Sequence, residues 1–165
     1  MKKILLGLFT ILFAMTLFNC EKDDICEDGT PTTPRLIVEF YDNNNPSNLK
    51  TITDLGIKAT GMSTGILFTN TSKIQVPLKT DQNTVSYDFV LDSQTPGIAI
   101  TDNITINYTR NDVYISRACG YKTSFTLNDN PNGMVLNTPK NWIQEITIQK
   151  FIIENENEIH VKIFF

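Results

Sequence analysis

The sequence has few of the side chains that enzymes use most often for acid–base or nucleophilic catalysis. It contains a single histidine, His160, and three cysteines. A mechanism that pairs a serine or cysteine nucleophile with a histidine would have to use His160. The alternation around His160 predicts that its side chain faces solvent, and no Gly-x-Ser-x-Gly motif supplies a nucleophile. We therefore expect no catalytic residue and no enzyme activity. A hydrolase would require His160 in a cleft beside a carboxylate.

The sequence also lacks the motifs that bind phosphate, metal ions or cofactors. No glycine-rich phosphate loop is present, and no cysteine pair has the spacing of a zinc site. Glu154, Glu156 and Glu158 alternate along one segment and offer carboxylates to calcium. That segment lacks the aspartate and glycine pattern of a dedicated calcium site. We expect neither a metal nor a cofactor.

The sequence has fewer basic residues than acidic residues. The chain has 14 lysines and arginines against 18 aspartates and glutamates, a formal net charge of −4. Lys2 and Lys3 precede the expected cleavage site described below, so processing would make the chain more acidic still. An acidic chain is repelled by phosphate backbones and by anionic lipid headgroups. We therefore exclude nucleic acid as a partner.

No apolar pattern with a helical period continues beyond one turn. Instead, short runs rich in isoleucine, valine, threonine and aromatic residues alternate with polar residues and are separated by Asn, Asp, Pro and Gly. This pattern predicts eight to ten strands over residues 35–165 and one antiparallel β-sandwich of the immunoglobulin or transthyretin type. A small β-barrel is the second possibility.

Four local features carry more specific predictions. Pro77 cannot donate to a strand ladder, so its strand is expected at a sheet edge. Asn111–Asp112 suits a tight reversal between two strands of a hairpin. Thr138–Pro139 is suited to start one helical turn that carries Trp142. The apolar parity changes near Lys150, which indicates a β-bulge.

The N-terminus has the features of an export signal. Lys2-Lys3 precede an apolar run from Ile4 to Phe18, which is short for a membrane-spanning helix of about 20 residues. We expect residues 1–19 to be a signal peptide. An uncleaved N-terminal anchor helix is the alternative.

Leu17-Phe18-Asn19-Cys20 resembles the lipobox of bacterial lipoproteins, which implies that Cys20 is the lipidated residue. A second acyl chain makes membrane anchoring stable where one chain is marginal. Residues 20–34 are then a lipidated cysteine and an extended tether. Glu21–Asp24 resembles the short export signal of surface lipoproteins, and both the cell surface and the periplasmic face of the outer membrane remain open.

Lipidation of Cys20 would leave Cys26 and Cys119 as an even pair in an oxidising compartment. We expect a disulfide between them, with two free thiols as the alternative. Gly120 lies beside this pair and suggests a bulge or corner.

The aromatic residues support a second functional hypothesis, glycan binding. Trp142, Tyr41, Tyr114 and Phe164 could form a platform for a glycan if they gather on a solvent-facing surface. Scattered aromatics in a sandwich are more often core or ordinary surface.

Three segments together resemble an uncharacterised family of small lipoproteins from Bacteroidota. The segments are Cys20–Cys26, Ser116–Lys122, and Ile153–Glu156 followed by His160–Phe164. The resemblance supports an outer-membrane lipoprotein and implies no catalytic residue. We expect a non-enzymatic envelope protein, anchored to the membrane by its lipid, that binds a protein partner or supports an assembly. A carbohydrate-binding module of a nutrient-uptake system is the alternative.

Overall fold

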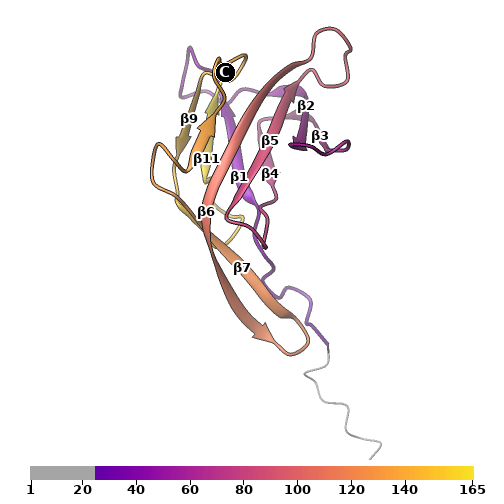
Figure 1. The fold of residues 1–165 in the computed structure, drawn as a ribbon, viewed down its shortest axis with the longest axis vertical. Coiled ribbons are helices and arrows are strands. Elements are labelled where there is room, and N and C mark those ends of the chain that lie inside the picture. Colours follow the sequence, from indigo (N-terminus) through magenta and orange to yellow (C-terminus); the bar gives the residue numbers. More distant parts are fainter. Residues whose placement is uncertain (1–24) are drawn as a thin grey trace, which may run out of the picture. The chain divides into compact units, whose positions relative to one another are not determined.

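The computed structural model describes residues 25–165 and is all-β, as predicted (Figure 1). Contacts divide the described residues into two units. The small unit comprises residues 25–31 and 114–122, and the sandwich unit comprises residues 32–113 and 123–165.

One sheet of the sandwich has four strands in the order β4-β1-β11-β9. Their bounds are Lys73–Val76 for β4, Leu36–Tyr41 for β1, Val161–Phe164 for β11 and Glu145–Ile148 for β9. The central pair, β1 and β11, is parallel, whereas β4 and β9 pair antiparallel with their neighbours. β4 is therefore an edge strand that ends immediately before Pro77, which confirms the edge predicted from this proline.

The other sheet has seven strands, six of them in the order β10-β7-β6-β5-β2-β3, with β8 paired to β6. Their bounds are Ile152–Ile153 for β10, Gly120–Leu127 for β7, Ile100–Ser116 for β6, Thr84–Leu91 for β5, Ile52–Ala59 for β2, Ile66–Thr71 for β3 and Met134–Leu136 for β8. β5 and β6 are antiparallel over eight residue pairs, from Thr84↔Asn107 to Leu91↔Ile100.

The core lies between the two sheets and follows the predicted alternation. Leu36, Val38 and Phe40 of β1 are fully buried in the core cluster, as are Ile104 and Ile106 of β6. Burying a side chain of this size stabilises the fold by about 1.5–3 kcal/mol. The alternation seen in the sequence therefore corresponds to real burial in both sheets.

A buried carboxylate fixes the loop that closes the core. Asp102 on β6 is fully buried and accepts hydrogen bonds from the backbone amides of Asn141, Trp142 and Ile143 at 2.8–2.9 Å. The indole Nε1 of Trp142 donates to the carbonyl of Phe89 at 3.1 Å. Because its amides are held in this way, the loop places the Trp142 ring in the core.

The reversal predicted at Asn111–Asp112 is wrong, because both residues lie inside β6, which runs unbroken for 17 residues. Two hydrogen bonds tie them to β7. The Thr123 hydroxyl donates to Asp112 Oδ1 at 2.7 Å, and the Ser124 hydroxyl donates to the Asn111 carbonyl at 3.2 Å. The chain turns instead just before Gly120, whose φ of +70° favours glycine. The corner predicted at Gly120 is confirmed.

The helical turn predicted at Thr138–Pro139 is also wrong, and no helix occurs among residues 25–165. The amides that a helix would leave free at this point are taken by Asp102 instead. The predicted bulge near Lys150 is confirmed, because the amides of Gln149 and Lys150 both donate to the carbonyl of His160. After the bulge the chain passes from β9 in one sheet to β10 in the other.

We predict that Asp102→Asn lowers the free energy of unfolding at pH 7 by about 1–3 kcal/mol. Asparagine offers one oxygen and no charge to the three amides, and its own NH₂ group faces donors. Urea unfolding followed by Trp142 fluorescence measures the change.

Burial alone would raise the pKa of Asp102, but the amide hydrogen bonds of Ile143, Trp142 and Asn141 outweigh it, so the pKa is lowered. The difference in free energy of unfolding between the wild type and Asp102→Asn is therefore complete above the unfolded-state pKa of Asp102, about 4. It is lost as the pH falls through the folded-state pKa of Asp102. The control is Asp112→Asn, an exposed position on the same strand, where the amide oxygen can still accept from Thr123. An equal loss in both variants would contradict this role for Asp102.

Candidate functional site

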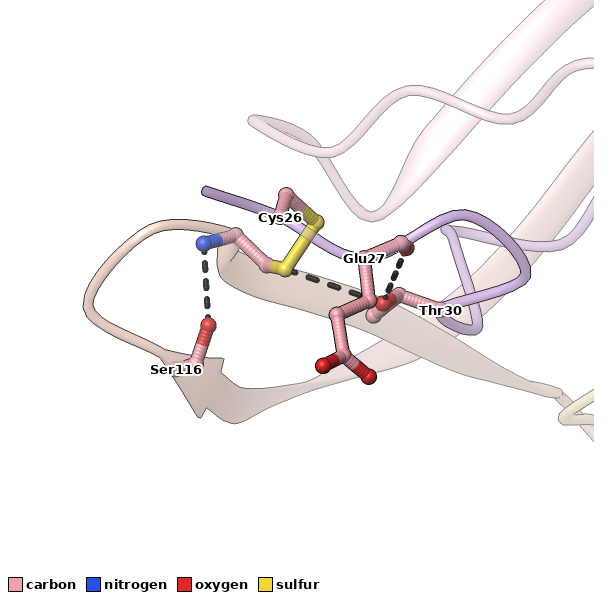
Figure 2. The surroundings of a disulfide bond; sticks show 5 residues. Cys26, Glu27, Thr30 and Ser116 are labelled. Atoms are coloured by element: carbon pink, nitrogen blue, oxygen red, sulfur yellow. Dashed lines mark hydrogen bonds between the residues drawn. A yellow bond between two sulfur atoms is a disulfide. The ribbon is translucent and has the colours of Figure 1, made fainter. Parts of the chain in front are cut away.

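The small unit is organised around the predicted disulfide, which is present. Cys26 and Cys119 are bonded with their Cα atoms 4.9 Å apart, and they lie 93 positions apart in the sequence (Figure 2). The bond joins the N-terminal arm to the turn between β6 and β7. Closing a loop of this size removes up to about 4–5 kcal/mol of chain entropy from the unfolded state.

Local hydrogen bonds shape the chain on both sides of the disulfide (Figure 2). The amide of Cys119 donates to the Ser116 hydroxyl at 3.0 Å, which fixes the turn. On the arm, the amide and the hydroxyl of Thr30 both donate to the carbonyl of Glu27, at 3.2 and 2.6 Å. Thr30 Oγ1 also lies 3.8 Å from Cys119 Sγ. Each side of the disulfide therefore has its own turn.

The predicted lipid site, Cys20, and the predicted signal peptide, residues 1–19, lie outside the described residues. The disulfide partner Cys26 follows Cys20 by six positions. Among the residues that the structure describes, no helix has the length and apolar character needed to cross a membrane.

His160 is buried, with 1% of its surface exposed, so the predicted solvent-facing position is wrong. Its Nδ1 accepts a hydrogen bond from the amide of Ile37 at 3.0 Å, while its own amide donates to the Ile37 carbonyl. Ile37 is itself fully buried, although it alternates with the core residues of β1. His160 thus supports the parallel pairing of β1 and β11. Its Nε2 has no hydrogen-bond partner, so no carboxylate orients the ring as a hydrolytic mechanism requires.

Two of the three glutamates considered for calcium are engaged in ion pairs. Glu156 accepts from the amide and Nε of Arg35 on Oε1, at 3.0 and 2.7 Å, and from Nη2 on Oε2 at 2.7 Å. The Arg35 hydrogen bonds lower the pKa of Glu156. Glu158 pairs with Lys150. Within residues 25–165 no group of three His, Cys, Asp or Glu side chains is arranged to hold a metal ion.

The same segment lines a surface cleft of about 410 Å³ in the sandwich unit. Lys150 and Glu158 line this cleft, together with the apolar side chains of Phe151 and Ile152. Lys150 and Glu158 are paired with each other, and Glu154 adds a second carboxylate to the lining of the cleft.

Of the four aromatics considered as a glycan platform, the structure brings Tyr41 and Phe164 together, with their ring centroids 5.6 Å apart. Trp142 and Phe164 are buried. Tyr41 lies under the ammonium group of Lys162, which is 4.4 Å from its ring centroid. Tyr114 is exposed but belongs to the small unit, where it contacts Tyr121.

The family model of unknown function DUF6452 matches residues 54–165. The chain belongs to this family. The matched span begins within β2 and includes Cys119 and His160, but it does not reach Cys26. No curated protein and no solved structure matches the chain. The expectation of an uncharacterised family is therefore confirmed at this level.

Two features of this DUF6452 chain were not predicted from its sequence. The Arg35–Glu156 pair joins residues 121 positions apart, and no local pattern indicates such a distance. The sequence did offer a signal for the contact between Tyr114 and Tyr121, because the two residues lie on either side of the corner predicted at Gly120. The expectation of a hairpin at Asn111–Asp112 concealed it.

We predict that His160 makes the stability of the DUF6452 chain depend on pH below neutrality. Burial lowers the pKa of His160, and the nearby Glu158 opposes this only in part. The unfolded chain, with a histidine pKa near 6.5, therefore binds the proton more readily than the folded one. The stabilisation of the folded chain by neutral His160 is therefore complete above about pH 6.5. It is lost as the pH falls from there toward the folded-state pKa of His160. Chemical unfolding at several pH values between 8 and 5 measures the slope.

His160→Asn is the matched variant, because its Oδ1 can still accept from the Ile37 amide and does not titrate. We expect a flatter pH profile for His160→Asn than for the wild type. His160→Ala leaves the Ile37 amide unpaired and should lose about 1–3 kcal/mol at pH 7. Identical slopes for the wild type and His160→Asn would contradict the assignment.

Proposed function

We propose that this DUF6452 chain is a lipid-anchored protein of the bacterial cell envelope that binds or supports other envelope components without catalysing a reaction. The observation that carries the proposal is the disulfide between Cys26 and Cys119. Disulfides of this kind persist in oxidising compartments and are rare in the cytosol. The pairing supports export, and it leaves Cys20 as the one remaining cysteine of three.

Cys20 has the surroundings that a lipid anchor requires. It follows a short apolar run and the lipobox-like residues Leu17–Asn19, and it precedes the charged residues Glu21–Asp24. The thiol of this cysteine would take up the diacylglyceryl group. The resemblance to small lipoproteins of Bacteroidota supports the outer membrane as the location, at either the cell surface or the periplasmic face.

The non-enzymatic part of the proposal is supported by how the chemically versatile side chains are used. His160 bonds the backbone of β1, Asp102 bonds three backbone amides, and Glu156 holds Arg35. Each of these groups is engaged in holding the fold rather than directed into a cleft.

A solvent-facing aromatic strip containing Trp142 would favour the carbohydrate-binding alternative. Because Trp142 is 6% exposed and donates its indole N–H to the Phe89 carbonyl, it is not available to stack on a sugar. The buried position of Trp142 weakens the alternative, and we retain the anchored binding or structural module as the proposed function.

We predict that the chain incorporates an alkyne-tagged fatty acid in its native host through Cys20. Cys20→Ser should lose the label by at least about tenfold, because the thiol accepts the lipid. Glu21→Ser, a change at the adjacent position, is the matched control and should keep the label. An unlabelled wild-type chain, or a labelled Cys20→Ser variant, would contradict the proposal.

A further inference from the structure

Among the aromatic residues between positions 25 and 165, only Tyr114 and Tyr121 are exposed, at 57% and 70%. They lie on either side of the turn between β6 and β7, and their ring centroids are 5.3 Å apart. Both belong to the small unit. The rings meet at an interplanar angle of 65°, and more than half of the surface of each side chain stays exposed.

Ile25 adds an exposed aliphatic side chain to the same unit, with 77% of its surface accessible. It precedes Cys26, whose disulfide partner Cys119 lies two positions before Tyr121. The apolar residues of the arm and of the turn are therefore joined by a covalent path that is only a few residues long.

We propose that Tyr114, Tyr121 and Ile25 lie in the interfacial region of the lipid bilayer that holds the acyl chains of Cys20. This inference rests on the proposed function. Tyrosine is enriched where the hydrocarbon meets the headgroups, because its ring is apolar and its hydroxyl bonds water. The two exposed tyrosines have this chemistry.

The length of the tether makes a membrane the occupant of this surface. Cys26 follows Cys20 by six residues, and a chain spans at most about 3.5 Å per residue, so Cys26 lies within about 20 Å of the lipidated residue. The disulfide extends this limit to Cys119, and with it to the turn between the two tyrosines. Without the bond, the covalent path from Cys20 to Tyr121 would run through about 100 residues and would impose no useful limit.

The contact does not depend on attraction between opposite charges. Loss of Lys2 and Lys3 with the signal peptide changes the formal charge of the chain from −4 to −6, and the residues that we place in the interface are uncharged. Anionic headgroups would repel such a chain. The matching surface is therefore a bilayer of zwitterionic lipid, and added salt should leave the contact unchanged.

The test uses the lipidated chain that begins at Cys20, purified from membranes and reconstituted into phosphatidylcholine vesicles whose lipids are brominated near the interface. Tyr121→Trp places a tryptophan at the proposed contact, while Trp142 in the core supplies a constant background. Leu49→Trp is the matched control. It is 55% exposed in the wild type and belongs to the sandwich unit, where it pairs with Tyr41 at the end of β1.

We expect bromine to quench the added emission of Tyr121→Trp roughly twofold, with little effect on Leu49→Trp and no change when salt is added. Reduction of the disulfide should weaken the quenching. A lipidated chain in which Tyr121→Trp is quenched no more than Leu49→Trp overturns this inference but leaves the anchor standing, and it would favour a protein partner for the tyrosines. A chain that carries no lipid overturns both the anchor and this inference.

Discussion

The closure of the sandwich depends on the buried carboxylate of Asp102. A charge in this position is costly unless it is fully hydrogen-bonded, and here three consecutive amides satisfy it. In return, the loop that carries those amides holds the Trp142 ring, which bonds β5 through Phe89 and contacts Phe40 of β1 at 6.5 Å between centroids. One residue of β6 thereby fixes a side chain that contacts strands of both sheets.

The disulfide between Cys26 and Cys119 has a comparable role in the small unit, because it joins an arm to a turn that is distant in the sequence. The hydrogen bonds of Asp102 act in the sandwich unit, and the disulfide acts in the small unit. Asp102 and His160 use ionisable side chains to hold the backbone of the sandwich, which leaves them committed to structure. The disulfide links the fold to the segment that begins at Cys20, where we propose that the lipid is attached.

Much of the fold could be predicted from the sequence because half-buried strands alternate, and the alternation of β1 and β6 survives in the structure. The edge position before Pro77 and the corner at Gly120 followed from backbone chemistry that acts locally. The alternation along one strand does not indicate whether side chains on the outer face of a sheet are buried. Ile37 and His160 alternate out of the core and are buried nevertheless, and His160 bonds the Ile37 amide across 123 positions of sequence. Asn111 and Asp112 likewise have the composition of a turn, but their cross-strand partners Ser124 and Thr123 keep them in a strand.

Of the candidate site, the disulfide pair was predicted from the number of cysteines that lipidation of Cys20 would leave. The exposed tyrosine pair was not predicted, because the turn between β6 and β7 was expected at Asn111–Asp112.

The most direct test of the central claim, one lipidated cysteine and one disulfide in the same chain, is the intact mass of the protein extracted from its native membrane. We expect a chain that begins at Cys20, carries the added mass of acyl groups, and gains the mass of two hydrogens on reduction. Alkylation before reduction should leave it unmodified, and alkylation after reduction should add two groups, at Cys26 and Cys119. A chain that retains residues 1–19, lacks acyl mass, or is alkylated before reduction would contradict the claim.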